Sequence, residues 1–252
     1  MTSASWRNVW ITGASTGIGA ALARRLDTHV PHVALSARSQ DKIDALCATG
    51  TTLRSYPLDV VDADATRQVV AAIGASGGPI DLAVLNAGTW ALQDAPEFTL
   101  EAVRRGLDVN VNGVYNGLHA VLPSMLERGA GHIAIVASVA GYRGLPRSIA
   151  YAPTKAALIN LAEILRLELA PKGITVSVVN PGFVDTPMTE QNDFDMPGLI
   201  SAEVAAEAME KGLRAGRYEV SFPFGFTLMM KVLRVLPHWL YFWLAKRLVP
   251  KG

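Results

Sequence analysis

The 252-residue sequence predicts a single α/β domain built on a doubly wound parallel sheet of about seven strands. Two observations support this prediction. Short apolar runs alternate with longer helical patterns almost to the end of the chain, which is typical of folds made of successive strand–helix units. Several of the short runs are apolar at nearly every position, as expected for parallel strands that helices cover on both faces.

The predicted strands lie at 8–12, 32–37, 52–57, 80–86, 131–138, 174–180 and 218–222. The predicted helices lie at 17–27, 39–48, 63–75, 99–127, 151–170 and 201–215. Right-handed crossovers between parallel strands place such helices on the two faces of the sheet. Because the sequence has no Pro/Gly/Ser-rich linker, repeat or low-complexity segment, we expect one domain over residues 1–222 and an amphipathic C-terminal tail over 223–252.

The junction between the first strand and the first helix carries three glycines, Gly13, Gly17 and Gly19. In an open parallel sheet, ligands bind beyond the carboxyl ends of the strands. Gly13 would allow a tight exit from the strand, and the other two glycines would let helical N–H groups approach a phosphate. The segment lacks the Gly-Lys-Ser/Thr of a P-loop, which argues against an ATPase or GTPase. The spacing therefore predicts a Rossmann-like, dinucleotide-binding turn.

The second predicted strand ends in LSARSQ, with Arg38 and Ser39 where an acidic residue would select NAD. A carboxylate at this place accepts hydrogen bonds from the ribose hydroxyls and repels a 2′-phosphate, whereas an arginine suits the phosphate. The sequence therefore favours NADP(H) as cofactor. Two alternatives stay open: use of NAD(H), and a solvated surface arginine without a role in binding.

Two further stretches supply groups for proton transfer. Ser138 ends a buried strand at the ligand edge of the sheet, and Tyr151 and Lys155 lie four residues apart, on one face of a helix. A lysine cation and an oxidised nicotinamide would both favour the phenolate and lower the pKa of Tyr151. The tyrosine could then donate a proton in ketone reduction, or accept one in alcohol oxidation, while Ser138 binds the substrate oxygen.

Together these motifs resemble those of the short-chain dehydrogenase/reductase family, in its single-domain subtype. The matching motifs are TGxxxGxG at 12–19, LDV at 58–60, NAG at 86–88, Asn110, Ser138, the YxxxK of Tyr151 and Lys155, and NPGFVDTPM at 180–188. The resemblance implies an oxidoreductase that interconverts a ketone or aldehyde and a secondary alcohol. It also implies a homodimer or homotetramer formed through the long helices at 99–127 and 151–170.

The resemblance also assigns roles to residues. It implies that Tyr151 is the acid/base, that Lys155 binds the nicotinamide ribose and lowers the tyrosine pKa, that Ser138 positions the substrate, and that Asn110 holds a water in the proton relay. The residues expected at the cofactor are Gly13, Ser15, Thr16, Gly17, Ile18, Gly19, Arg38, Ser39, Asp59, Val60, Asn86, Ala87, Gly88, Tyr151, Lys155, Pro181, Gly182, Val184 and Thr186.

The residues expected around the substrate are mainly apolar or aromatic. Met188, and Trp90 and Tyr142 near the expected pocket mouth, are predicted to contact the substrate together with Ser138, which favours an apolar ketone. The tail surrounds a few basic residues with apolar and aromatic ones. Such a segment can lie on a bilayer surface, or it can pack on its own domain or on another subunit.

The bulk composition gives no sign of nucleic-acid binding, because the formal net charge is only +1. We predict no metal site. The single cysteine, Cys47, indicates a reduced, cytoplasmic setting, with membrane-surface association as an open option. Two alternatives to the reductase remain: a dinucleotide-binding sensor or scaffold without turnover, and a nucleotide-sugar epimerase or dehydratase, for which the region after the last strand is too short.

Overall fold

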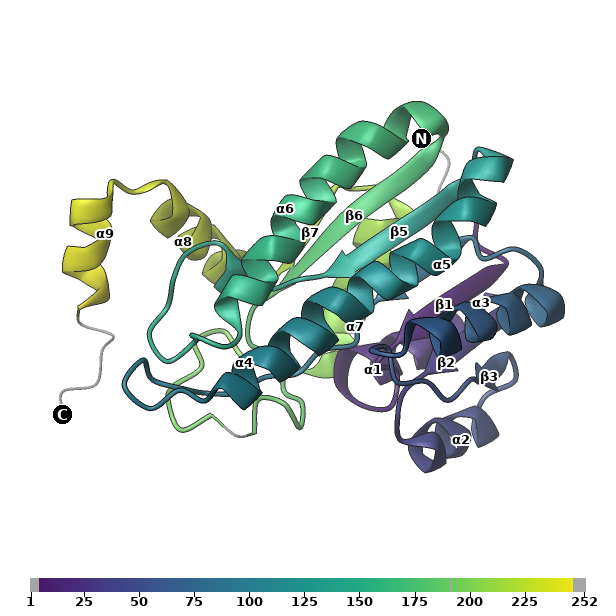
Figure 1. Cartoon of the computed structure of the whole chain (residues 1–252), viewed down its shortest axis with the longest axis horizontal. Coiled ribbons are helices and arrows are strands. Elements are labelled where there is room, and N and C mark those ends of the chain that lie inside the picture. Colours follow the sequence, from purple (N-terminus) through teal and green to yellow (C-terminus); the bar gives the residue numbers. More distant parts are fainter. Residues whose placement is uncertain (1–4, 191, 247–252) are drawn as a thin grey trace.

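The computed structural model describes residues 5–190 and 192–246 and shows a seven-stranded sheet in the order β3-β2-β1-β4-β5-β6-β7 (Figure 1). All neighbouring strands are parallel. The strands are β1 Asn8–Thr12, β2 His32–Ser36, β3 Leu53–Ser55, β4 Leu82–Leu85, β5 Gly131–Val136, β6 Ile174–Pro181 and β7 Glu219–Phe222. The order reverses between β1 and β4, so the predicted doubly wound α/β fold is confirmed.

Helices cover both faces of the sheet. They are α1 Gly17–Leu26, α2 Gln40–Ala48, α3 Ala63–Gly77, α4 Leu100–Leu107, α5 Gly113–Arg128, α6 Ala152–Leu169, α7 Ala202–Arg214, α8 Phe224–Val235 and α9 His238–Ala245. One apolar core lies between the sheet and α1, α2 and α7, and a second lies between the sheet and α3, α5 and α6. The central strands are buried at every residue, which explains their nearly continuous apolar runs.

The long helix predicted at 99–127 is interrupted in the structure. A π-helical turn, Asp108–Asn112, separates α4 from α5. A π turn inserts an extra residue into the helix and changes the direction of the side chains that follow. Here it accompanies a fully buried Asn110, whose side chain contacts both the loop after β4 and α6. The interruption depends on these contacts between distant parts of the chain, so helical periodicity did not reveal it.

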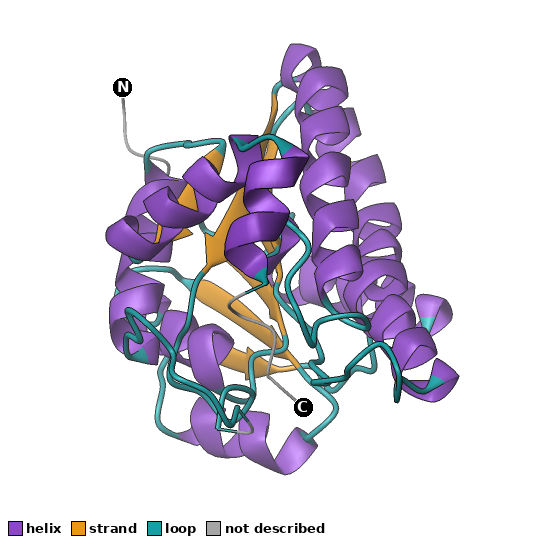
Figure 2. Ribbon diagram, turned by 90° about the vertical axis from the view of Figure 1, so that its left-hand side faces the viewer, coloured by secondary structure: helices purple, strands orange, loops and turns teal. Residues whose placement is uncertain are grey.

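The C-terminal tail begins with α8 and α9, which lie along one side of the body (Figures 1 and 2). Met230 of α8 is buried in the second core, and Tyr241 of α9 is buried against the segment that follows β5. None of the described helices is both long and apolar enough to cross a bilayer. The end of the predicted tail, residues 247–252, lies outside the described residues.

Candidate active site

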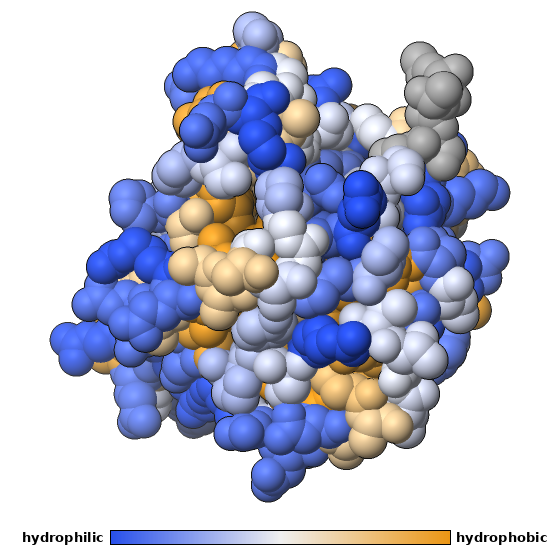
Figure 3. Space-filling view, turned by 90° about the vertical axis from the view of Figure 1, so that its right-hand side faces the viewer, coloured by the Kyte–Doolittle hydropathy of each residue, from blue (hydrophilic) through white to orange (hydrophobic). Residues whose placement is uncertain are grey.

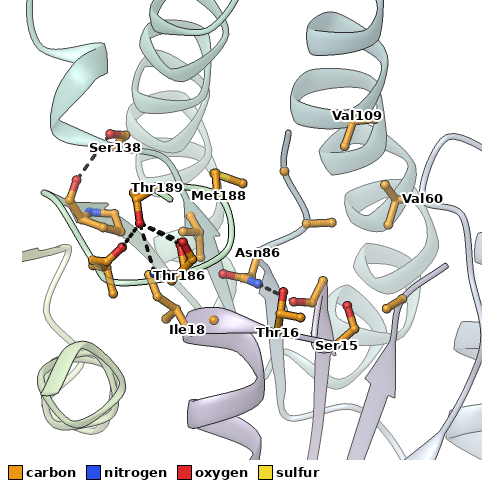
Figure 4. Close-up of a pocket in the computed structure, with 18 of the residues that line it drawn as sticks. Ser15, Thr16, Ile18, Val60, Asn86, Val109, Ser138, Thr186, Met188 and Thr189 are labelled. Carbon is orange, nitrogen blue, oxygen red and sulfur yellow. Dashed lines mark hydrogen bonds between the residues drawn. The ribbon is translucent and has the colours of Figure 1, made fainter. Parts of the chain in front are cut away.

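A cleft of about 340 Å³ opens at the carboxyl ends of the parallel strands. Ser138, Thr186 and Met188 lie at one end and Ser15 and Val60 at the other (Figure 4). The cleft is lined by these predicted cofactor residues: Gly13, Ser15, Thr16, Gly17, Ile18, Arg38, Ser39, Asp59, Val60, Asn86, Ala87, Gly88, Tyr151, Lys155, Pro181, Gly182, Val184 and Thr186. Segments from the ends of six strands, β1 to β6, therefore meet at one site.

The glycine turn is closely packed against the end of β4. Gly13 has a φ of +65°, and a Cβ there would lie 2.7 Å from the Cα of Ala87. Asn86 fixes this contact, because its Nδ2 donates to the carbonyl oxygens of Thr12 at 3.0 Å and Gly13 at 3.1 Å. Both the backbone conformation and the lack of space therefore require glycine at position 13.

Gly19 is not among the residues that line the cleft, which differs from the prediction. A Cβ at this position would lie 2.5 Å from the carbonyl oxygen of Gly13 and 2.8 Å from Nδ2 of Asn86. Gly19 therefore lets α1 pack closely on the turn, and its predicted contact with the cofactor stays a prediction. Sequence spacing alone does not distinguish these two uses of a glycine.

The first turn of α1 fits an anion. Thr16 is the N-cap residue, its side chain makes no capping hydrogen bond, and the first turn contains no acidic residue. The first N–H groups of a helix lack intrahelical partners, and the helix dipole favours negative charge at this end. Arg38 lies exposed at the same cleft, one strand away. The residues present therefore fit the phosphates of a dinucleotide.

Three polar side chains meet at the other end of the cleft. Ser138 follows β5, and its Oγ accepts from the N–H of Ala140 at 3.1 Å. Tyr151 and Lys155 lie at the start of α6, with the Lys155 Nζ 5.5 Å from the centre of the Tyr151 ring. Pro153 is tolerated between them because it lies in the first turn, where its missing N–H has no intrahelical partner.

Burial sets the protonation of this group. It raises the pKa of Tyr151 to about 12, although a hydrogen bond with Ser138 opposes the shift. Burial also lowers the pKa of Lys155 to about 8, while its Nζ donates to the carbonyl oxygen of Val136 at 3.0 Å. Without a bound cofactor, desolvation is the largest cause of the shift, and Tyr151 is a neutral phenol at pH 7. The lowering of its pKa by Lys155 and an oxidised nicotinamide stays a prediction for the cofactor-bound protein.

Asn110 lies behind the cleft and does not line it. Its Oδ1 accepts from the N–H of Thr89 at 2.7 Å. Its Nδ2 donates to the carbonyl oxygen of Thr89 at 3.1 Å and to Oγ1 of Thr154 at 3.0 Å. Asn110 thus joins the loop after β4 to the first turn of α6, next to Lys155. A role in holding a relay water stays a prediction.

Of the residues predicted to contact substrate, Ser138 and Met188 line the cleft and two others do not. Trp90 packs edge-on against Tyr151, with ring centroids 4.7 Å apart, and its Nε1 donates to Oδ1 of Asn192 at 3.1 Å. It therefore supports the tyrosine from outside the cleft.

Tyr142 was expected near the pocket mouth, but it is buried and its hydroxyl donates to Glu219. Glu219 also accepts from Nδ2 of Asn180 at 3.0 Å and forms an ion pair with Lys231 of α8 at 2.6 Å. Tyr142 therefore belongs to a polar cluster under α8. Local sequence patterns carry no signal for this placement, because Glu219, which accepts the hydrogen bond, lies 77 residues further along the chain.

Six further residues line the cleft that were not predicted from the sequence, namely Ala37, Leu58, Val109, Val136, Ala137 and Thr189. Most are small or apolar neighbours of predicted residues at strand ends, where the chain carries no distinctive side chain. Thr189 has a clearer role, because its Oγ1 accepts from the N–H of Thr186 at 3.1 Å and donates to the carbonyl oxygen of Val184 at 2.6 Å. Thr189 therefore joins residues of the same loop after β6 to one another.

Within the described residues, no group of three or more His, Cys, Asp or Glu side chains could hold a metal ion.

Comparisons with known proteins agree with this geometry. A family model described as short chain dehydrogenase matches residues 7–196. An uncharacterized oxidoreductase of Myxococcus xanthus is 39% identical over 98% of this chain and 100% of its own length. A 3-dehydrosphinganine reductase of Arabidopsis thaliana is 33% identical over 95% of this chain and 77% of its own. The crystal structure of levodione reductase superposes with a TM-score of 0.82 at 26% identity, covering 88% of this chain and 98% of that one.

Proposed function

The chain belongs to the short-chain dehydrogenase/reductase family and is an NAD(P)-dependent oxidoreductase; from this premise we propose that it reduces an apolar ketone with NADPH. The observation that carries the proposal is the convergence of Ser138, Tyr151 and Lys155 at one end of the cleft, with Arg38 at the other. A bound nicotinamide dinucleotide would supply the hydride. The proposed proton donor, and the groups proposed to bind the substrate oxygen and the 2′-phosphate, are side chains of this chain.

Tyr151 is the proton donor in the proposed reaction. Its phenol is protonated at pH 7, so the hydroxyl can donate to the substrate oxygen as negative charge develops there. Ser138, which hydrogen-bonds Tyr151, would bind the same oxygen and stabilise that charge. Lys155, still largely protonated at pH 7, supplies a positive charge beside the phenol and lowers the cost of the phenolate that forms.

NADP(H) is proposed over NAD(H) because Arg38 lies at the cleft, directly after β2. A guanidinium offers a planar pair of donors to a 2′-phosphate, whereas the diol of NAD gives it little to bind. Replacing Arg38 with Asp should lower kcat/KM for NADPH about 10- to 100-fold, as expected for one charged hydrogen-bonding group. The variant Lys172→Met on the exposed surface serves as control.

The substrate is proposed to be an apolar, long-chain ketone. Met188, Phe194 and Leu199 of the loop after β6 are partly exposed at 36%, 39% and 44%, so this loop offers an apolar cover. Phe183 packs on Phe194 with ring centroids 5.9 Å apart, which extends the cover toward the cleft. The name of the plant relative, a 3-dehydrosphinganine reductase, points to the same substrate class.

The test is NADPH oxidation with a series of ketones of increasing chain length, from a water-soluble methyl ketone to a long-chain 3-keto amine. Quinones, sugars and acyl thioesters are included as competing classes. We expect kcat/KM to rise with chain length, and Tyr151→Phe to lose at least about a hundredfold in kcat. Equal NADPH consumption by Tyr151→Phe would refute the proposed proton donor. A flat response to chain length would refute the apolar substrate.

A homodimer or homotetramer is also proposed, through the outer faces of α4, α5 and α6. Tyr115 and Leu126 of α5 and Ile164 and Leu167 of α6 are exposed, with Leu167 at 77%. Leu167→Lys should shift the mass measured by light scattering toward the monomer. A parent protein that is already monomeric would refute this proposal.

A further inference from the structure

Helix α8 presents an apolar stripe to solvent. Phe224, Leu228, Val232 and Val235 are exposed, with Phe224 at 79% and Val235 at 78%. Their spacings of four, four and three residues place them on one face of the helix. Met230, which lies on the inward face, is buried in the core. Among the residues that the structure describes, α8 therefore has one apolar face packed on the core and a second apolar face exposed to solvent.

Helix α9 repeats this arrangement. Trp239, Phe242 and Trp243 are 73%, 57% and 55% exposed and share one face, while Tyr241 is buried on the other. The residues Trp239, Phe242 and Trp243 also line a shallow hollow together with Lys246. We call α8 and α9 together the C-terminal arm. The side of the molecule opposite the arm has a mainly hydrophilic surface with small apolar patches (Figure 3).

Charge indicates what covers the arm. Residues 221–252 contain five basic side chains, Lys231, Arg234, Lys246, Arg247 and Lys251, and no acidic one. Lys231 and Arg234 form ion pairs with Glu219 and Glu163 of the body, so the remaining positive charge of this segment comes from Lys246, Arg247 and Lys251. A two-fold contact between copies would bring the same basic patch together on both sides. An anionic lipid surface would instead attract the basic side chains and receive the apolar and aromatic ones. Helices of 12 and 8 residues are too short to cross the bilayer, so they would lie in its interface.

The arm is held by the segment that follows the catalytic serine. Arg143 donates to the carbonyl oxygens of Arg234 at 3.2 Å and Leu236 at 3.3 Å, and its guanidinium lies 4.5 Å from the centre of the Tyr241 ring. The Tyr241 hydroxyl donates to the carbonyl oxygen of Gly144. Both helices of the arm are therefore tied to residues 143–144, a few positions after Ser138.

The start of α8 also contacts the substrate side of the cleft. Phe226 packs on Phe183, with ring centroids 5.2 Å apart, and a Cβ on Gly182 would lie 2.7 Å from the Phe226 ring. Gly182 lines the cleft, and Phe183 packs on Phe194 of the apolar cover. A surface bound to the arm would therefore lie next to the loop that covers the substrate.

We propose that the C-terminal arm binds the interface of an anionic membrane and holds the substrate side of the cleft beside it, so that an amphiphilic ketone enters from the bilayer. The membrane contact is independent of the reaction, whereas the entry route rests on the function proposed above. Aromatic side chains such as Trp239 would lie at headgroup depth. The basic side chains would make binding stronger on anionic lipid and weaker at high salt.

Flotation of the full chain with vesicles of equal parts phosphatidylglycerol and phosphatidylcholine tests the contact. We expect the parent to float, and the double variant Trp239→Ser/Phe242→Ser to bind at least about tenfold more weakly. The matched control Val61→Ser/Val204→Ser removes two apolar side chains that are 41% and 54% exposed and lie outside α4, α5, α6 and the arm, and it should float like the parent. A parent that does not float, or an arm variant that floats equally well, would overturn the proposal.

Sedimentation velocity on the same proteins identifies the competing occupant. If the parent sediments as an oligomer and does not float with vesicles, and the arm variant sediments as a monomer, then a second copy covers the arm and the membrane proposal is wrong. Turnover of a water-soluble ketone should be equal in the parent and the arm variant, whereas turnover of a vesicle-embedded ketone should fall only in the variant. Failure of both substrates in the parent would overturn the proposed function and the entry route, while flotation still decides the contact.

Discussion

Replacing Lys155 with Met should stabilise the protein while it abolishes activity. Lys155 is only 3% exposed, and burial lowers its pKa from 10.5 to about 8. At about 1.4 kcal/mol per pKa unit, holding the charged side chain in this place costs about 3 kcal/mol at pH 7. The hydrogen bond to the Val136 carbonyl oxygen returns about 1 kcal/mol of this cost. We therefore expect Lys155→Met to raise the free energy of unfolding by about 2 kcal/mol at pH 7.

The stability advantage of Lys155→Met should depend on pH. Between pH 8 and 10.5 the unfolded chain binds a proton at Lys155 that the folded protein has lost, so the parent gains stability as the pH rises. From pH 7 to pH 9.5 this gain amounts to about 2 kcal/mol. The advantage of Lys155→Met should shrink by that amount, because methionine does not titrate.

Urea unfolding of both proteins at pH 7 and 9.5 measures this effect, and the difference between them cancels groups that titrate equally in each. Lys172→Met is the matched control, because Lys172 is exposed and its loss should change stability by less than about 0.5 kcal/mol. A Lys155→Met protein that is less stable than the parent at pH 7, or an advantage independent of pH, would refute the reasoning.

Three further perturbations follow from the fold. Burial lowers the pKa of His132 to about 4, so between pH 6.5 and 4 the unfolded chain takes up a proton that the folded protein does not. The free energy of unfolding should therefore fall by about 3 kcal/mol across that range, and by much less in His132→Asn. Urea unfolding of both proteins at each pH measures the difference. Gly13→Ala should lower the melting temperature by about 10 °C or more, because it combines a φ of +65° with a Cβ 2.7 Å from a backbone atom; an unchanged melting temperature would contradict the account of the turn. Arg147 forms two hydrogen bonds to Asp193 at 2.7 and 3.0 Å, so Asp193→Asn should speed proteolytic cleavage within residues 188–200 while it leaves the urea midpoint of global unfolding nearly unchanged. Equal cleavage rates in the two proteins would show that this ion pair does not hold the loop.

The fold could be predicted from the sequence because its signals are local. Apolar runs such as 82–85 need only their own composition to indicate a buried parallel strand. The glycine turn and the four-residue spacing of Tyr151 and Lys155 are equally short-range patterns, and the residues they single out line one cleft at the carboxyl edge of the sheet. Errors in the strands were limited to their ends, as for β3, which is shorter than predicted.

The errors in the site concern residues whose partners are distant in the sequence. Tyr142 was predicted near the pocket mouth, but it is buried and its hydroxyl donates to Glu219. Gly19 was predicted at the cofactor, but it does not line the cleft and lies against Gly13 and Asn86. The π turn at Asp108–Asn112 likewise accompanies contacts of Asn110 with Thr89 and Thr154. A local sequence pattern does not indicate which distant residue a polar or small side chain will contact.

The sequence by itself determined the order of strands and helices, the glycine turn and the candidate reacting groups, because each follows from spacing along a few turns of chain. Only the tertiary structure decided the protonation of Tyr151 and Lys155, since their pKa values depend on how completely other segments exclude water from them. It also decided that the C-terminal arm stands beside the substrate loop, because Arg143 and Phe183, distant in sequence, hold it there.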